Sequence, residues 1–226
     1  MKIKTLSLPT HNLNSMREFY TDVFGLPLVD EDKSSFTLQA GSTRLAFIGT
    51  KDGKAPKHHF AFNIPPNLFQ EAKAWLAERT ELVRGKEGQV EFDFSNWDAR
   101  GLYFLDPAGN IGELIARDML PEAETSRFTA AAILSVSEIG IPVANVPETV
   151  TALRQTAGLL PYRGATETFT AVGDENGLLI VVQQGREWYP KTGVSAEDSA
   201  MQILIKSANL DYLVTTGQQG IQIQPN

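Results

Sequence analysis

The pattern of apolar and polar positions in the first half of the chain predicts short strands separated by two amphipathic helices. Apolar residues recur at helical spacing in the stretch that ends at Val23, and again in the stretch that begins at Asn67. Gly25 follows the first stretch and suits a helix C-cap. Short apolar or alternating runs before, between and after these helices are typical of strands. The order of strand, helix and three strands therefore occurs twice within residues 1–117.

A strand–turn–strand pattern closes this half of the chain. Residues 101–117 read GLYFLDPAGNIGELIAR, in which the turn sequence DPAGN separates two apolar runs. Proline presets one backbone dihedral and glycine tolerates positive φ, so this composition favours a tight turn. We therefore assign Asp106, Gly109 and Asn110 to the structure of the turn.

One carboxylate interrupts the second strand of this hairpin. Side chains alternate across a strand, so Glu113 shares its face with Ile111 and Ile115. A carboxylate between two isoleucines is explained by a polar cavity, by a paired charge or by a position at the sheet edge. The sequence leaves these three explanations open.

The pattern restarts in the second half of the chain, which indicates an internal repeat. A shift of 133 residues keeps the order strand, helix, Gly-Leu, strand, Phe-Thr and strand without a gap. The aligned pairs are Asn12 with Asn145, Gly25 with Gly158, Phe36 with Phe169, and Leu45 with Leu178. After Gln184 the copies diverge, because residues 186–199 are longer than the corresponding segment of the first copy.

The repeat predicts an α+β fold of tandem β-α-β-β-β modules that form a curled mixed sheet. We expect a complete paired-module domain over residues 1–117, a linker over 118–132, and a second domain over 133–226. Only one full module and part of another fit into the second domain, so the fourth module is truncated.

Composition excludes several functions. The chain of 226 residues has a net charge of -7, which argues against nucleic acid or an anionic membrane as a partner. It contains no cysteine, which excludes disulfides and thiolate chemistry. It has no glycine-rich phosphate loop, no G-x-S-x-G motif, no stretch long and apolar enough to span a membrane and no signal-peptide pattern near residue 1. We therefore expect a cytoplasmic protein.

Three stretches carry a resemblance to a known family. FYTDVFGLPL, HHFAFNIP and, above all, YFLDPAGNIGEL resemble the vicinal oxygen chelate superfamily. This group includes glyoxalase I, bleomycin-resistance proteins, fosfomycin-resistance enzymes and extradiol dioxygenases. The resemblance implies that paired modules curl a sheet into a cup, and that one divalent metal, such as Mn, Fe, Ni or Zn, is bound inside it.

The resemblance places the metal ligands at particular residues. The family histidine falls on His59, the family carboxylate on Glu113 and the remaining ligand on Thr5. Threonine is not a usual ligand for these metals, which prefer imidazole and carboxylate. By the repeat, Thr5 corresponds to Glu138, a secondary candidate in the second domain whose partner positions there are poor. For Glu138 we favour a carboxylate at a sheet edge or an interface.

Two readings remain for the central pair. His59 and Glu113 are either metal ligands or an acid–base pair, or they are a structural hydrogen-bonded pair left from a former metal site. Tyr103 and Arg44 are candidates for contacts to an anionic or aromatic ligand. We expect His58 to be a partly exposed residue at the strand end.

Three functions follow from these observations. The first is a metal-dependent lyase or dioxygenase acting on a small molecule. The second is a metal-free binder of a small molecule, like the drug-sequestering proteins of the bleomycin-resistance type; the threonine at the third ligand position favours it. The third is an interaction protein whose third module forms a homodimer.

Overall fold

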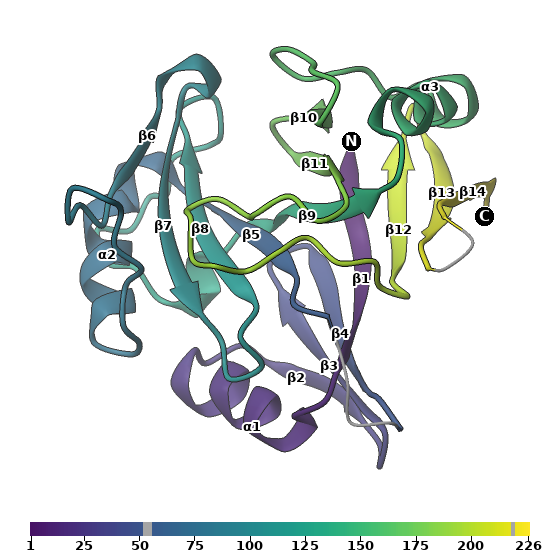
Figure 1. Cartoon of the computed structure of the whole chain (residues 1–226). Coiled ribbons are helices and arrows are strands. Elements are labelled where there is room, and N and C mark those ends of the chain that lie inside the picture. The colour runs from purple at the N-terminus through teal and green to yellow at the C-terminus, as the bar shows by residue number, and fades with distance from the viewer. Residues whose placement is uncertain (52–55, 218–219) are drawn as a thin grey trace.

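The computed structural model describes residues 1–51, 56–217 and 220–226, and over these residues the strands form two mixed sheets (Figure 1). The first sheet has seven strands in the order β14 (Gln222–Pro225), β13 (Leu210–Thr215), β12 (Gln202–Ser207), β1 (Lys2–Thr10), β4 (Thr43–Gly49), β3 (Ser35–Ala40) and β2 (Leu28–Glu31). The second has seven in the order β10 (Phe169–Asp174), β11 (Gly177–Gln183), β9 (Ser135–Val143), β5 (His59–Ile64), β8 (Ile111–Arg117), β7 (Ala99–Leu105) and β6 (Phe92–Phe94). The predicted α+β class is confirmed.

Three α-helices occur within the described residues: α1 (Leu13–Glu18), α2 (Phe69–Ala77) and α3 (Val146–Ala157). The first continues as a π-helical segment over Phe19–Val23. Local sequence explains the bounds of α3, because the side chain of Asn145 accepts a hydrogen bond from the backbone of Glu148 at 3.1 Å. At its other end Gly158 adopts φ 67°, the left-handed conformation that glycine takes without strain. The truncated fourth module consists of β12, β13 and β14, and no α-helix follows β12 in the described part of the chain.

Strand pairing crosses between the two halves of the chain. The first module joins the partial fourth module through the antiparallel pair β1 and β12, and the second module joins the third through β5 and β9. We expected the two modules of residues 1–117 to share one sheet, and this expectation is wrong. Sequence similarity identifies each module. It does not identify the module that shares a sheet with it, because long-range contacts determine that pairing. The division into domains at residues 117 and 133 stays a prediction.

The two sheets pack against each other through one hydrophobic core, and the second sheet has a separate face turned away from it. Phe60 on β5 belongs to this core, and its ring lies 6.4 Å from that of Phe47 on β4. Because side chains alternate along β5, the neighbouring residues His59 and Ala61 point to the opposite face. The chain between β11 and β12 passes across that face in front of β8 (Figure 1).

No helix in the described part of the chain combines the length and the apolar composition that a membrane crossing requires.

Candidate metal centre and cavity

Three neighbouring strands of the second sheet bring two carboxylates and one imidazole together. Ala61 on β5 lies opposite Glu113 on β8 and opposite Glu138 on β9, so its small methyl group separates the two acids. His59 precedes Ala61 by two residues and therefore projects from the same face. The register of three strands thus fixes the cluster.

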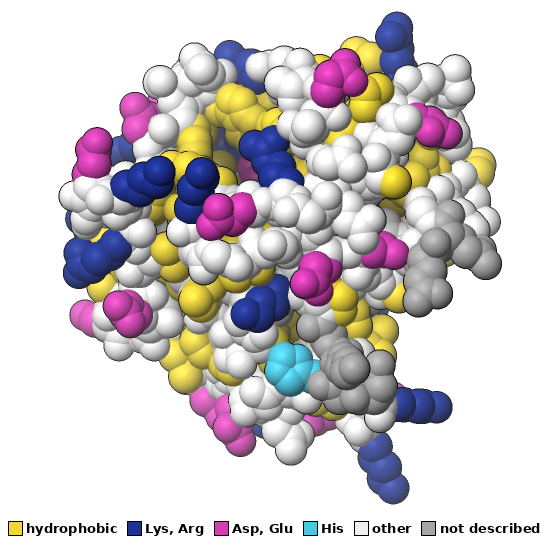
Figure 2. Space-filling model, viewed as in Figure 1, with side chains coloured by type: hydrophobic (Ala, Val, Ile, Leu, Met, Phe, Trp, Pro, Cys, Tyr) yellow, Lys and Arg dark blue, Asp and Glu magenta, His cyan; other side chains and the backbone are white. Residues whose placement is uncertain are grey.

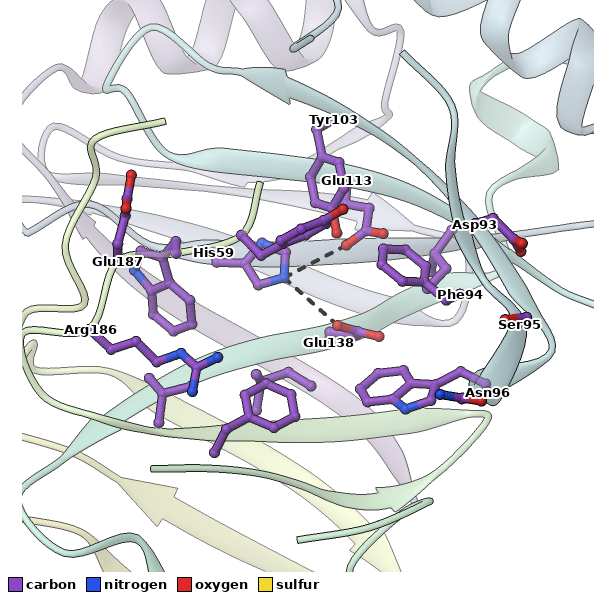
Figure 3. A pocket seen from close by; sticks show the side chains of 17 residues that line it. His59, Asp93, Phe94, Ser95, Asn96, Tyr103, Glu113, Glu138, Arg186 and Glu187 are labelled. Carbon is purple, nitrogen blue, oxygen red and sulfur yellow. Dashed lines mark ion pairs between the residues drawn. The ribbon is translucent and has the colours of Figure 1, made fainter. Parts of the chain in front are cut away.

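The three side chains converge to within metal-ligand reach of one another (Figure 3). The Nε2 atom of His59 lies 3.7 Å from an Oε2 of Glu113 and 3.7 Å from an Oε2 of Glu138. One ligand atom from each residue can be chosen so that all lie within 4.8 Å of one another. All three residues are buried.

A β-bulge turns Glu138 into the cluster. Phe62 lies opposite Val136 whereas Ala61 lies opposite Glu138, so Ser137 is an extra residue without a partner on β5. Glu138 is only 4% exposed, and its strand β9 has a neighbour on each side. Our interpretation of Glu138 as a carboxylate at an edge or an interface is therefore wrong.

Arg117 adds a buried cation beside the cluster. Its Nη2 donates to Oε1 of Glu138, and it also lies 3.5 Å from Oγ of Ser137. The Nε and Nη1 atoms of Arg117 have no hydrogen-bond partner within the described residues. Arg117 was not predicted as a site residue, although the alternation along β8 that places Glu113 in the cup also places Arg117 there, four residues later.

The two carboxylates have opposite electrostatic environments. Burial, followed by repulsion from Glu138, raises the pKa of Glu113 well above its usual value, while Arg117 and the hydroxyl of Tyr103 act in the other direction. Burial would also raise the pKa of Glu138, but hydrogen bonding to His59 and the charge of Arg117 outweigh it and lower that pKa. Without a further cation, one acid is therefore held ionised and the other favours its protonated form.

The histidine ring is oriented by a second contact. Its Nδ1 atom lies 3.3 Å from the carbonyl oxygen of Ile111, which can only accept a hydrogen bond. We therefore place a ring hydrogen of His59 on Nδ1, and this contact orients the ring so that Nε2 faces Glu113 and Glu138. Metal-binding histidines are commonly held by such a contact through the other nitrogen.

These residues fit a divalent metal. Oε1 of Glu113 is buried and lacks a hydrogen-bond partner among the described residues, so the site has an unused acceptor. Gly101 on β7 leaves room for this oxygen, because a Cβ atom there would clash with it. Imidazole and carboxylate are the ligand types that Mn, Fe, Ni and Zn accept, and the charge of a divalent ion would offset the repulsion between the two acids.

The second and third modules contribute to the cluster in parallel ways, except at one position. His59 lies beside Ile111 on its neighbouring strand, and Glu138 lies beside Leu178 in the same parallel arrangement. Glu113 lies two residues after Ile111 on β8, and Ile180 lies two residues after Leu178 on β11. The position that would provide a fourth protein ligand therefore holds Ile180, whose hydrocarbon side chain lines the cavity instead.

A cavity of about 390 Å³ opens over the cluster. This volume lies at the small end of the usual range for ligand pockets, about 300–1,000 Å³. Figure 2 shows a hollow with largely hydrophobic walls and basic side chains beside it. Aromatic residues make up much of the wall: Phe94, Trp97, Tyr103, Phe169, Trp188 and Tyr189.

The structure brings some of the remaining sequence candidates to this cavity and leaves others elsewhere. Tyr103 lines it and lies directly opposite Glu113 on the neighbouring strand. Thr5 and Arg44 do not line it, because they are paired neighbours on β1 and β4 of the other sheet. Their proposed roles in ligand binding therefore have no support from this site. His58 is buried, against our expectation of partial exposure, and its Nε2 lies 3.4 Å from Oγ of Ser199.

Sequence reasoning also missed most of the cavity wall. Trp97 and Trp188 both line the cavity, and neither was a site candidate from the sequence. The sequence pattern marks Phe169 only as one of the aligned positions of the repeat. The one available signal was the unmatched length of residues 186–199, the segment that includes Trp188.

Two curled mixed sheets, one of which has a cup with a buried His-Glu-Glu cluster, define the glyoxalase and dioxygenase type of fold. The family model described as "Glyoxalase/Bleomycin resistance protein/Dioxygenase superfamily" matches residues 2–114. The chain belongs to this superfamily.

Solved structures agree with this fold. A putative dioxygenase from Bacillus subtilis superposes with a TM-score of 0.64 at 13% identity, covering 100% of this chain and 84% of that chain. Glyoxalase I from Zea mays superposes with a TM-score of 0.58 at 12% identity, covering 100% of this chain and 92% of that chain. Comparison with curated protein sequences finds no match. At these identities the structural likeness establishes the fold alone.

Proposed function

We propose that the protein is an enzyme that binds one divalent metal through His59, Glu113 and Glu138 and acts on a small molecule in the cavity above them. The observation that carries this proposal is the convergence of an oriented imidazole with two buried carboxylates at the floor of the cavity. The chemistry is of the lyase or ring-cleavage type. Such a metal would supply Lewis-acid stabilisation of negative charge on a substrate oxygen.

The side chains around the cluster have three further roles: positioning a ligand, holding a proton and excluding water. Arg117 holds Oε1 of Glu138, which leaves the other oxygen of that carboxylate to face His59. Glu113 has a raised pKa, so it can accept and hold a proton while the site is poor in positive charge. Ile180 and the aromatic wall exclude water from the side on which no protein ligand stands.

One observation favours the alternative, a metal-free binder of a small molecule. Arg117 already neutralises one carboxylate, and Ile180 occupies the position of a fourth ligand. A protonated Glu113 beside an Arg117–Glu138 ion pair is a balanced arrangement without any metal. Homodimer formation and a cytoplasmic location stay predictions under both functions.

Elemental analysis of the purified protein for Mn, Fe, Ni and Zn separates these functions. We expect about one metal per chain, and we expect His59→Ala and Glu113→Gln to lose it. His11→Ala is the matched control, because His11 is exposed on the surface and should not change the metal content. Failure to retain any of these metals after loading would support the metal-free binder, provided that circular dichroism shows folded protein.

A further inference from the structure

One wall of the cavity is the segment that is longer than its counterpart in the first module. We call residues 184–199, between β11 and β12, the strap. Its two arms are joined by backbone hydrogen bonds from Gly185 to Ala196 at 2.8 Å, from Ala196 to Arg186 at 2.7 Å and from Trp188 to Val194 at 2.9 Å. These bonds give the strap a defined shape, so its side chains hold fixed positions around the cavity.

Trp188 fixes the strap to the floor of the cup. Its indole ring lies over Gly140 on β9, where any Cβ atom would collide with the ring. The same ring lies 5.6 Å from the imidazole of His59. Gly140 does not have a positive φ, so the close approach of Trp188, and not the backbone conformation, is the reason that glycine is needed there.

The remaining walls favour a planar ring. Tyr189 of the strap lies 6.0 Å from Phe94, and on another part of the wall Trp97 lies 6.3 Å from Phe169. Aromatic faces interact well with another flat ring in offset or edge-to-face geometry. A cavity of about 390 Å³ with such walls suits a small aromatic molecule better than a flexible chain.

The strap also contributes the basic residue of the cavity wall. Among the described residues that line the cavity, Arg186 is the only lysine or arginine. Its guanidinium lies 5.2 Å from the ring of Phe169, and Nη1 donates to Oγ1 of Thr168 at 3.2 Å. No carboxylate of the described chain lies within ion-pair distance of it, whereas Arg163 is paired with Asp98.

The two acidic residues at the rim do not neutralise this charge. Figure 3 shows the Arg186 guanidinium directed inward, while the Glu187 carboxylate points away from the Glu113–Glu138 cluster. Glu187 accepts a hydrogen bond from the backbone of Gly193 at 3.0 Å, which holds it within the strap. Asp93 comes from β6 on the other side of the cavity. Arg186 is therefore free to pair with a ligand.

We propose that the strap makes the cavity selective for a small aromatic anion, whose ring lies among the aromatic walls and whose carboxylate, or a group of like charge, pairs with Arg186. Guanidinium and carboxylate form charge-assisted hydrogen bonds that a neutral group does not replace. This inference concerns the ligand of the cavity named under the proposed function, but it does not depend on whether a metal is bound.

Calorimetric titration with matched probes tests the inference. The probes are 4-hydroxybenzoate, its neutral analogue 4-hydroxybenzamide, and the non-aromatic cyclohexanecarboxylate. We expect 4-hydroxybenzoate to bind about tenfold tighter than either of the others, which corresponds to about 1.4 kcal/mol. In Arg186→Gln the advantage over the amide should disappear, while the affinity for the amide stays within about twofold. Arg44→Gln is the matched control, because Arg44 lies on the other sheet, and it should keep the advantage.

Three results would overturn the inference: equal affinity of the native protein for the acid and the amide, an unchanged preference in Arg186→Gln, or no saturable binding of any probe at about 10 mM. The metal content of each sample is measured in parallel. If the native protein binds no metal but still prefers the acid, the result contradicts the proposed enzyme and leaves the strap inference intact. A normal metal content without that preference contradicts the strap inference alone.

Discussion

At the scale of single residues, the site depends on the balance of buried charge. Arg117 is the only basic residue in contact with Glu138, apart from His59, in the described part of the chain. Replacing it by methionine leaves Glu138 close to Glu113 without a guanidinium. We expect Arg117→Met to lower the free energy of unfolding at pH 7 by about 3–5 kcal/mol, as for other broken buried pairs.

Urea denaturation of the single and double variants measures this effect. Arg117→Met combined with Glu138→Leu removes both charges, and should be less destabilised than Arg117→Met alone. A double variant that loses as much stability as the two single variants together would show that these residues act independently, against the geometry of their ion pair.

A second prediction concerns the space that Gly101 leaves for Glu113. The Cβ atom of alanine at position 101 would overlap Oε1 of Glu113 and approach the ring of Phe94 at 2.9 Å. We expect Gly101→Ala to displace the carboxylate, to reduce metal content if metal is bound, and to cost about 1–3 kcal/mol of stability. In the control Gly85→Ala, the three nearest atoms belong to the flexible end of Gln89, which can move aside, so stability should change by less than about 1 kcal/mol.

A third prediction uses the turn residue Asp106. Burial raises its pKa from 3.8 to about 6, although hydrogen bonds from Asn110, Tyr20 and Ala108 act in the other direction. The folded state therefore holds a proton that the unfolded chain releases between about pH 4 and pH 6, so ionisation destabilises the fold as the pH rises through that window. Asp106→Asn should lack this loss, because an amide does not ionise.

Chemical denaturation at several pH values checks this sign. Relative to Asp106→Asn, the native protein should lose on the order of 2–3 kcal/mol of stability between about pH 4 and pH 6, and the difference should then level off. A stability difference that is constant across this range would contradict the raised pKa of Asp106.

Local rules predicted some of these residues from the sequence and failed for others. Asp106 and Asn110 belong to a turn whose chemistry is contained in five consecutive residues, and Oδ1 of Asp106 does bind the backbone of Asn110 at 3.0 Å. The role of Glu138 could not be found in this way, because its face depends on a bulge and its partners come from two other strands. The repeat did mark the position, by aligning it with Thr5.

At the scale of elements, the strap and the strand beneath it form one packing unit. We predict that Gly140→Ala, which forces Trp188 away from β9, lowers the free energy of unfolding by about 1–3 kcal/mol. In the background of Trp188→Ala the same change should cost less than about 0.5 kcal/mol, because the colliding ring is gone. Thermal or urea unfolding of the four proteins measures this cycle, and equal costs in both backgrounds would contradict the proposed contact.

The elements themselves were largely predictable, whereas the strap was not. Amphipathic spacing and capping residues give the helices, as Asn145 and Gly158 show for α3. The strap has no periodic pattern of apolar residues. Its backbone hydrogen bonds join two arms that meet only after the chain has turned back on itself. Only its excess length over the first module indicated that it differs.

At the scale of the whole molecule, neither half of the chain completes a sheet. Residues 1–117 would expose the sides of β1 and β5 that β12 and β9 cover in the full chain. Unpaired strand edges promote association. We predict that a fragment of residues 1–117 is unfolded or self-associates, whereas fragments 1–127 and 128–226 expressed together form a folded complex.

Size-exclusion chromatography with light scattering distinguishes these outcomes. A folded, monomeric fragment of residues 1–117 would contradict the prediction and would support the domain boundary expected from the sequence. The full chain should unfold in one transition, because both sheets contain strands from both halves.

The choice of partner modules marks the limit of what this sequence reveals. The family and the module repeat were evident in short motifs, since each motif is local. The pairing of β5 with β9 depends on contacts such as that of Arg117 with Glu138, which join residues of different modules. As a result, the cup was placed within residues 1–117, and its second acid, Glu138, was assigned to a separate domain.

The bulge at Ser137 has a consequence for how this protein can change over generations. One surplus residue in β9 decides whether the acid at position 138 meets an imidazole or is turned toward phenylalanines and leucines. Loss of that single codon would reverse the orientation of one half of the strand relative to the other, with every other side chain retained. A one-residue deletion would therefore remove the acid from the cup as effectively as a substitution of Glu138. In a relative with such a deletion, an alignment that ignores the gap would still match an acid to this position, although that acid no longer reaches the metal position.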